Sequence, residues 1–451
     1  MKHTKRIIVY ILFQILIVSQ SLGQNCSSLN IQLESDITSS CNNMVMTMLH
    51  DQLGRPYLYV ANKEAGLTIF DISTISSPTP VDTIQTNLFD TLHVMNLTQD
   101  GNYLYLAIGN HFTNPQKGGL AIIDVTNPTI PVLEDYYVLP SSANGAGIVK
   151  VEGNYAYLGA MKSGVVILDV TNKNNIIFVS QFVPDINFPV LNPNSDLYNA
   201  RGMEVKNSIV YLCYDAGGFR VINCIDKNNP IETGRYANPT SYTPFNLPRA
   251  YNNIILDDSL VFISVDYCGV EVLNISDTSN ITLSGWWNPY NCPNNNWFSS
   301  PVHSNEMYYD NTCKHLFVST GKSDLVVIDV SDPTQPDSCN FYGGGSNSIA
   351  TWGVSSYQNK IFLSYICALI PFSSNWTGVK ILTYTPCSAN SNEGKVNNRF
   401  SIFPNPAQNS ITLNSKNWVN KSDAKANITN IMGEILIQSS LLSSSTSIDI
   451  S

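Results

Sequence analysis

Polar and aromatic residues at one recurring place in the chain have side chains that could bind an anionic ligand. Each stands just before, or at the start of, the first strand-like segment of a repeated unit. They are Asn43, His93, Asn144, Asn199, Arg201, Arg249, His303, Asn305 and Trp352. Guanidinium and protonated imidazole groups pair with carboxylates and phosphates. The set therefore predicts a site for a carboxylate, a phosphate or a sugar acid, if the fold brings these positions together.

The repeated unit that carries these positions has a constant internal order. A β-rich stretch is followed by a glycine and then by an apolar strand that ends in Asp or Asn, as in residues 155–159, Gly164 and residues 165–170. The closing positions are Asp71, Asp124, Asp169, Asn223, Asn274, Asp329 and Thr383. They are 53, 45, 54, 51, 55 and 54 residues apart. The sixth copy has Asp324 where the others have glycine.

A unit of this length is typical of a four-stranded propeller blade with moderate loops. Its residues are mainly Val, Ile, Tyr and Phe, which favour strands, and helical periodicity is scarce. Small sheets arranged around an axis leave only short, protected edges. The sequence therefore predicts an all-β fold, a seven-bladed β-propeller over residues 24–387. The candidate anion-binding residues would surround its central channel.

The acid that closes each unit has a structural interpretation. An Asp or Asn side chain can accept hydrogen bonds from backbone amides of the turn that follows it. Asn replaces Asp in two of the copies, and both residue types can make this contact. We therefore interpret Asp71, Asp124, Asp169, Asn223, Asn274 and Asp329 as structural residues of the repeat rather than as ligands.

These strand-acid segments resemble the LVIVD repeat of bacterial and archaeal surface proteins. Residues 325–329 read Leu-Val-Val-Ile-Asp, and the resemblance covers about residues 44–384. It implies a β-propeller at or outside the cell envelope. It says little about function, because the motif is structural.

The N-terminus has the pattern of a secretory signal peptide, which we assign to residues 1–23. Lys2, Lys5 and Arg6 precede an apolar stretch over residues 7–18, and small residues follow. This stretch is shorter than the about 20 residues that a membrane span needs, and we predict no transmembrane segment. Removal of the signal leaves 21 basic and 34 acidic residues, a formal charge of −13. Such an acidic chain argues against binding to nucleic acid or anionic membranes.

The C-terminal part differs from the repeats. Residues 388–398 have the composition of a linker. Residues 399–451, with Pro404-Asn405-Pro406 after a short strand and an Asn-x-x-Gly turn ending at Gly433, resemble the sorting domain of type IX secretion in Bacteroidetes. The resemblance implies a small β-sandwich that is read by the outer-membrane export machinery. It places the protein outside the cell or on its surface, reached through the periplasm. The family's last strand and basic tail are missing, so we expect an incomplete domain.

Ten cysteines lie after the predicted cleavage point. They are Cys26, Cys41, Cys213, Cys224, Cys268, Cys292, Cys313, Cys339, Cys367 and Cys387. An even number in an exported chain favours disulfides. The seventh repeat ends without an outer strand, and residues 29–33 alternate like one, so we expect this N-terminal segment to complete the ring. Cys387 would then lie close to the N-terminal segment and pair with Cys26 or Cys41.

No nucleophile elbow, phosphate-binding loop or histidine metal motif is present, and we predict no cofactor or metal. Long loops at residues 183–200, 236–249 and 286–302 carry aromatic residues that could stack on sugars or anchor a partner. The favoured function is a non-catalytic binding or adhesion module for a glycan, a peptide or an envelope partner. The alternative is a hydrolase or lyase acting on an anionic or sugar substrate in the channel. The predicted ring contains no acid, which argues for the first.

Overall fold

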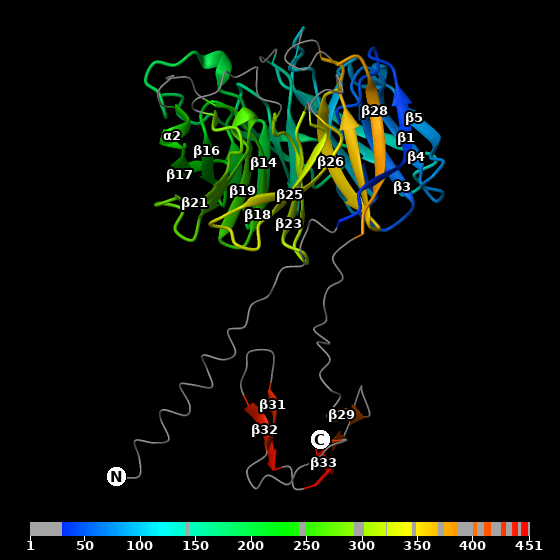
Figure 1. The fold of residues 1–451 in the computed structure, drawn as a ribbon. Helices are drawn as coiled ribbons and strands as arrows, with labels where there is room; N and C mark the ends of the chain where they lie inside the picture. The colour runs from blue at the N-terminus through cyan, green and yellow to red at the C-terminus, as the bar shows by residue number, and fades with distance from the viewer. Residues whose placement is uncertain are drawn as a thin grey trace. The chain divides into compact units, whose positions relative to one another are not determined.

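Seven four-stranded antiparallel sheets make up most of the chain. The computed structural model describes residues 29–112, 114–140, 144–242, 249–292, 302–321, 323–344, 349–368, 374–385, 400–403, 410–415, 425–429, 435–440 and 443–449. The chain divides into two compact units, residues 1–387 and 388–451. The seven sheets belong to the first unit (Figure 1).

The strands of blades one to four follow each other along the chain. Blade one consists of β2 (Thr47–His50), β3 (Tyr57–Asn62), β4 (Gly66–Asp71) and β5 (Thr79–Ile84). Blade two consists of β6 (Val94–Asp100), β7 (Tyr103–Ile108), β8 (Gly119–Asp124) and β9 (Val132–Val138). Blade three consists of β10 (Ile148–Glu152), β11 (Tyr155–Gly159), β12 (Val165–Asp169) and β13 (Ile177–Phe182). Blade four consists of β14 (Gly202–Lys206), β15 (Ile209–Cys213), β16 (Phe219–Asn223) and β17 (Ile231–Tyr236).

Blades five to seven continue this order, with one exception. Blade five consists of β18 (Tyr251–Asp257), β19 (Leu260–Val265), β20 (Val270–Asn274) and β21 (Thr282–Trp287). Blade six consists of β22 (Met307–Asp310), β23 (His315–Ser319), β24 (Leu325–Asp329) and β25 (Asp337–Tyr342). Blade seven consists of β26 (Thr351–Tyr357), β27 (Lys360–Tyr365), β28 (Thr377–Thr383) and, from the N-terminus, β1 (Gln32–Ser39). Short helical turns occur at η2 (Thr86–Phe89), η3 (Ser195–Leu197), α2 (Pro239–Tyr242) and η4 (Asp266–Cys268).

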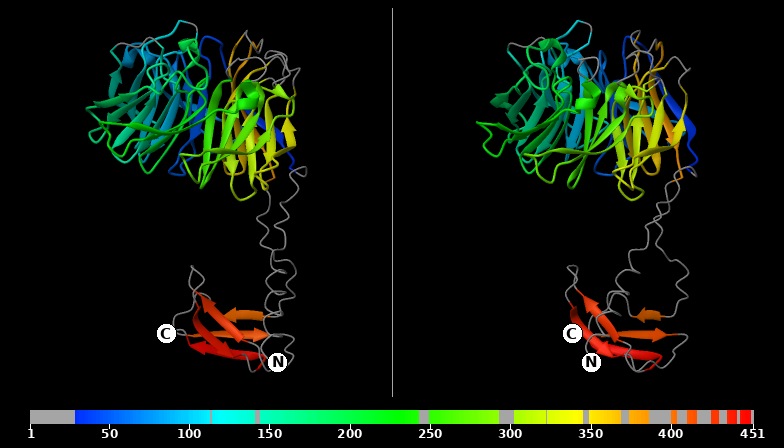
Figure 2. Two further views of the ribbon diagram at one scale, coloured as in Figure 1. Left: turned by 90° about the vertical axis from the view of Figure 1, so that its left-hand side faces the viewer. Right: turned by 60° about the vertical axis from the view of Figure 1, so that its left-hand side comes forward.

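The seven sheets close into a ring. The first strand of each sheet contacts the first strand of the next, and β26 of blade seven contacts β2 of blade one. The sheets stand side by side around a common axis (Figure 2). The contacts between consecutive first strands place these strands innermost. The prediction of an all-β, seven-bladed propeller is confirmed.

The core lies between neighbouring blades rather than at the axis. The middle strands are buried on both faces, and the buried clusters combine residues of adjacent sheets, such as Tyr105 and Leu120 of blade two with Val149, Leu158 and Val166 of blade three. Each fully buried apolar side chain of this size contributes about 1.5–3 kcal/mol. The apolar side chains of the strands therefore hold neighbouring blades together.

The closing residue of each of the first six blades caps the turn that follows. Its side-chain oxygen accepts a hydrogen bond of 2.6–2.9 Å from the backbone N–H two residues later. The pairs are Asp71 with Ser73, Asp124 with Thr126, Asp169 with Thr171, Asn223 with Ile225, Asn274 with Ser276, and Asp329 with Ser331. These are the contacts that the structural interpretation of the residues predicts.

The ring closes through the N-terminal strand, as predicted, but with different bounds. β1 pairs antiparallel with β28 from Gln32 opposite Thr383 to Ser39 opposite Thr377, and Figure 1 shows the two strands side by side. We expected residues 29–33 to form this strand. Leu29 instead packs into the hydrophobic cluster with residues of blades six and seven, and only 8% of its surface is exposed.

A disulfide holds this closing strand in place. Cys41, which follows β1, bonds to Cys367, which follows β27 and is 326 residues away. A second disulfide joins Cys268 and Cys292, and Cys313 and Cys339 are each disulfide-bonded. Cys213 and Cys224 are free and buried. The predicted pairing of Cys387 with Cys41 is wrong, because Cys41 already has a partner. Cys26 and Cys387 lie outside the described residues.

In six blades, the turn between the second and third strands forms a hydrogen bond with the next blade at the upper end of the propeller. The turn residue that we call the tip residue has a positive φ angle, between 23° and 103°, and its carbonyl oxygen accepts an N–H from the start of the next blade. The tip residues are Lys63, Gly109, Met161, Asp215, Asp266 and Gly321. In five of these turns the residue three positions later is also left-handed, usually a glycine. At Gly164 a Cβ would lie 2.2 Å from the carbonyl oxygen of Phe182, so the turn excludes any side chain there.

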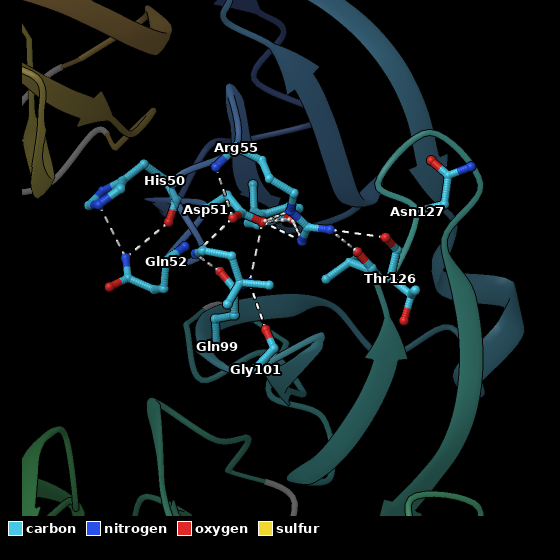
Figure 3. A network of polar contacts seen from close by, with 12 residues as sticks. His50, Asp51, Gln52, Arg55, Gln99, Gly101, Thr126 and Asn127 are labelled. Carbon is cyan, nitrogen blue, oxygen red and sulfur yellow. Dashed lines mark hydrogen bonds and ion pairs between the residues drawn. The ribbon is translucent and has the colours of Figure 1, made fainter.

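A buried polar network joins blades one and two at the turn after β2 (Figure 3). The carboxylate of Asp51, which has no exposed surface, accepts hydrogen bonds from Arg55 Nε, Tyr59 Oη and Gln99 Nε2 at 3.0, 2.6 and 3.3 Å. Arg55 also donates to the carbonyls of Val125 and Thr126. Burial alone would raise the pKa of Asp51, but these donors hold that pKa below its ordinary value.

Glu271 in β20 predicts a pH dependence of stability. Its side chain is fully buried and accepts a hydrogen bond of 2.8 Å from Tyr251 Oη. Burial raises the pKa of Glu271 from 4.5 to about 7, so the folded protein keeps a proton that the unfolded chain loses. The free energy of unfolding should therefore fall as the pH rises from about 4.5 through 7.

The neutral variant Glu271→Gln should remove the part of this fall that Glu271 contributes. At pH 8 we expect it to be more stable than the wild type by about 2–3 kcal/mol, and at pH 4 the two should be similar. Chemical denaturation at both pH values measures the difference. Parallel stability profiles for the two proteins would contradict the assignment.

The second unit is a small β-domain. β29 (Phe400–Phe403), β30 (Ser410–Ser415) and β33 (Ser445–Asp449) form one antiparallel sheet, and β31 (Lys425–Thr429) pairs with β32 (Ile435–Ser440). The motif residues Pro404, Asn405, Pro406 and Gly433 lie outside the described residues. In the part of the chain that the structure describes, no helix is both long and apolar enough to cross a membrane.

Candidate functional site

A small cavity lies at the upper end of the central channel, where the first strands begin. Its volume is about 40 Å³, room for a few water molecules. It is lined by Met46, Met95, Asn96, His111, Gly147, Ile148, Arg201, Asn252, Asn253, Asn305, Glu306 and Trp352. We call it the upper cavity. Residues from blades one to seven therefore meet there, although they are far apart in sequence.

Three of the predicted residues line the upper cavity: Arg201, Asn305 and Trp352. The guanidinium carbon of Arg201 lies 5.4 Å from the centre of the Trp352 ring. His303 stacks against Trp352, with the two ring centres 6.4 Å apart. The geometry thus brings one predicted arginine, one histidine and the tryptophan into a single aromatic and cationic cluster.

The other predicted residues lie around this cluster without lining the cavity. Arg249 is only 2% exposed, and its guanidinium donates to the carbonyls of Ser241 and Cys292, so it anchors two loops. Asn199 Nδ2 donates to Asp215 Oδ2 at 2.9 Å. His93 and Asn144 are half-buried, and Asn43 is exposed in a turn.

The prediction that the ring contains no acid is wrong. The tip residues Asp215 and Asp266 bring carboxylates to the upper end of the channel, where both interact electrostatically with Arg201. Asp266 Oδ1 lies 3.1 Å from His303 Nε2 and accepts a hydrogen bond from Asn252 Nδ2 at 3.0 Å. Glu306 adds a third carboxylate, and this one lines the cavity. The sequence signal for Asp215 and Asp266 is their position three residues before Gly218 and Gly269, which matches the tip residues of the other blades.

The three carboxyl groups titrate differently. Burial raises the pKa of Asp215 to about 6, against the charge of Arg201, and raises that of Glu306 to about 7. Burial opposes ionisation of Asp266 as well, but His303 and Arg201 hold its pKa below the ordinary value. Burial and the charge of Arg201 lower the pKa of His111 to about 3, so this imidazole is neutral. The site therefore combines a permanent cation with acids that differ in protonation near neutral pH.

Comparison with known families identifies both parts of the chain. Four segments match the LVIVD repeat, at residues 56–86, 93–138, 145–183 and 314–342. Residues 401–451 match the secretion system C-terminal sorting domain. The chain carries LVIVD repeats in a seven-bladed propeller, followed by a secretion sorting domain. The sorting domain implies the type IX secretion machinery as a partner, and secretion or display on the outer-membrane surface.

Solved structures share the fold of the LVIVD propeller at low sequence identity. The structure of U3-55K has 11% identity and a TM-score of 0.51, covering 78% of this chain and 98% of that one. Sqt1 from Saccharomyces cerevisiae has 10% identity and a TM-score of 0.51, covering 74% of this chain and 83% of that one. These likenesses show the fold alone. A comparison with curated proteins finds no match.

The matched LVIVD repeats correspond to blades one, two, three and six, all of which close with an aspartate. Blades four and five, which close with Asn223 and Asn274, contribute Arg201, Asp215, Asn252 and Asp266 to the site. Four polar residues of the site therefore come from the two blades that lack the closing aspartate, while His303, Asn305 and Glu306 come from blade six.

A larger cavity of about 330 Å³ lies below the upper cavity in the propeller channel. The two share Asn96, Ile148, Asn253 and Glu306, so they are consecutive sections of one channel. Lys150 and Glu204 form an ion pair of 2.7 Å in the wall of the lower section. Among the described residues, no group of three or more His, Cys, Asp or Glu side chains is placed to hold a metal ion.

The aromatic residues of the long loops are mostly structural where they are described. Trp287 and Tyr198 are buried, and Trp286 Nε1 donates to the carbonyl of Cys268 at 2.7 Å. Phe188 lies beneath the guanidinium groups of Arg220 and Arg235. Tyr290 is 41% exposed. The side chains of Tyr242, Phe245, Trp297 and Phe298 lie outside the described residues.

Proposed function

We propose that this exported propeller is a non-catalytic binding module and that its upper cavity binds the anionic group of a ligand. The observation that carries the proposal is the state of Arg201. Arg201 is half-buried, and its guanidinium lies against the ring of Trp352. Among the described residues, no side chain or carbonyl forms a hydrogen bond or ion pair with this guanidinium. A guanidinium carries five N–H donors, and leaving them unmatched in a confined site costs free energy. A carboxylate or phosphate would match them.

The size of the cavity limits what can enter. A volume of about 40 Å³ accommodates a group as small as a carboxylate, while a sugar ring or peptide chain would remain above the channel. The ligand classes that fit are an acidic glycan, the carboxylate end of a peptide, or a surface group of an envelope partner. Asn305 in the cavity wall, and His303 stacked on Trp352, would orient the inserted group.

The variant Arg201→Ala should weaken binding by about 10- to 100-fold, the loss expected for hydrogen bonds to a charged group. The full chain is first screened on glycan and peptide arrays, and the affinity of each hit is then measured by calorimetry. Lys206→Ala is the matched control, because Lys206 is an exposed cation at the opposite end of the same first strand, β14. If hits bind Arg201→Ala and wild type equally, their site is elsewhere.

A second candidate function rests on the acids of the same site. Burial raises the pKa of Asp215 while His303 and Arg201 help to lower that of Asp266, and such opposed shifts are typical of acid and base partners in catalysis. The candidate is a hydrolase or lyase acting on an anionic or sugar substrate. Assays against glycans, lactones and phosphoesters, with and without divalent metal, test it. Turnover that is lost in Asp215→Asn would replace the binding proposal.

A further inference from the structure

Two buried amide oxygens, on side chains of residues that line the upper cavity, have no hydrogen-bond donor among the described residues. They are Oδ1 of Asn252 and Oδ1 of Asn305, whose side chains are 7% and 2% exposed. Neither amide can be reversed to relieve this. Asn252 Nδ2 donates to Asp266 Oδ1 and to the carbonyl of Ser304 at 3.0 and 2.9 Å, and Asn305 Nδ2 donates to the carbonyl of Thr351 at 2.9 Å. All three partners are acceptors, so the orientation of each amide is determined.

The carboxyl group of Glu306 lies in the same wall and adds acceptor oxygens, which carry a negative charge above its raised pKa of about 7. Its Oε2 accepts a hydrogen bond of 2.8 Å from Thr47 Oγ1. Across the described part of the chain, no basic side chain lies within ion-pair distance of it. The wall formed by blades five and six thus presents acceptors that need a donor, preferably a positively charged one.

The opposite need exists at the blade-four side of the cavity. Arg201, in blade four, presents N–H donors that need an acceptor. Blade five lies between Arg201 and the segment with Asn305 and Glu306, which begins blade six. We propose that the ligand group bound in the upper cavity is a compact zwitterion, a carboxylate and an ammonium separated by one or two carbons, as in an α-amino acid. This inference rests on the proposed binding function and specifies its ligand class.

Simpler ligands match only half of the cavity. A lone anion would satisfy Arg201 but would leave both amide oxygens without donors and lie close to the carboxylates of Asp215, Asp266 and Glu306. A lone cation would satisfy the oxygens but would meet the charge of Arg201. In a zwitterion the carboxylate contacts Arg201 over Trp352, and the ammonium donates to Asn252, Asn305 and Glu306. Both sets of unmatched groups then acquire partners at once.

Three matched probes test the inference on the full chain. Glycine carries both charges, N-acetylglycine keeps only the carboxylate, and glycinamide keeps only the ammonium. We expect glycine to bind at least tenfold more tightly than either blocked form, as measured by calorimetry and NMR titration. Arg201→Gln and Glu306→Gln should each weaken glycine binding by about 10- to 100-fold, whereas Lys206→Ala should leave it unchanged.

The variants also separate the two ends of the ligand. Glu306→Gln should not weaken N-acetylglycine, because that probe has no ammonium, while Arg201→Gln should abolish its binding. Thermal melting confirms that each variant is folded, and Glu306→Gln keeps the size of the side chain. Equal affinity of glycine and N-acetylglycine, both dependent on Arg201, would overturn the zwitterion but leave the anion site intact. Absence of binding by all three probes overturns the zwitterion as well. The proposed function fails only if array hits are also insensitive to Arg201→Ala.

Discussion

Replacing Cys41 and Cys367 together with serine should lower the free energy of unfolding of the propeller by about 3–5 kcal/mol. The disulfide closes a segment with a sequence separation of 326 residues, and it fastens the N-terminal strand β1 beside blade seven. A cross-link restricts the unfolded chain more as the enclosed segment becomes longer. Chemical denaturation of the oxidised full chain measures the loss.

The pair Cys268 and Cys292 provides the matched control, because it encloses only 24 residues. Its replacement by serine should cost about 2 kcal/mol less than replacement of the long-range pair. If the two double variants lose the same stability, ring closure by Cys41 and Cys367 has no special entropic effect.

The variant Asp51→Ala should be the most destabilising single substitution in the first blade, with a loss of about 3–5 kcal/mol. Asp51 is fully buried and accepts from the side chains of Arg55, Tyr59 and Gln99 and from the backbone N–H of Leu53, so its removal takes an acceptor from all of these donors. The hydrogen bonds from Arg55 to the carbonyl oxygens of Val125 and Thr126 in blade two would also be lost. Denaturation at pH 7 measures the effect.

Two comparisons make the Asp51 prediction specific. Asp196→Ala removes an exposed ion pair with Lys162 and should cost less than about 1 kcal/mol. Because the pKa of Asp51 is lowered in the folded state, its stabilising effect is present above the unfolded-state pKa and is lost as the pH falls through the folded one. The difference between wild type and Asp51→Asn should therefore shrink in strong acid. A constant difference down to pH 2 would count against the network.

The fold could be predicted from sequence because its determinants recur. The period of the units, the apolar middle strands and the glycine turns are each repeated, so a single irregular copy such as the one with Asp324 does not obscure them. The capping role of residues such as Asp169 depends only on the next two residues, which is why it too could be foreseen. The closing strand was found from the missing outer strand of blade seven, but its bounds depend on where Leu29 packs, which involves contacts distant in sequence.

The candidate site was predicted only in part. Arg201, Asn305 and Trp352 were found because they precede first strands, which must surround the axis. Asp215 and Asp266 were missed because they lie in turns between other strands, and only the positive φ angle of the tip residue brings them to the channel. Arg249 occupies an equivalent place in sequence, but nearby loop carbonyls bind its guanidinium. Side-chain direction at these positions is decided by tertiary contacts that no local pattern encodes.

The pairing of β1 with β28 also has a consequence for biosynthesis. β1 is the first strand of the propeller to be synthesised, but its hydrogen-bonded neighbour, β28, is the last. A nascent chain that ends before residue 383 therefore has unpaired edges on β1 and β27, and both edges are paired with β28 in the complete protein. Proteases that cut exposed strands would remove such unfinished polypeptides, and complete ones would survive.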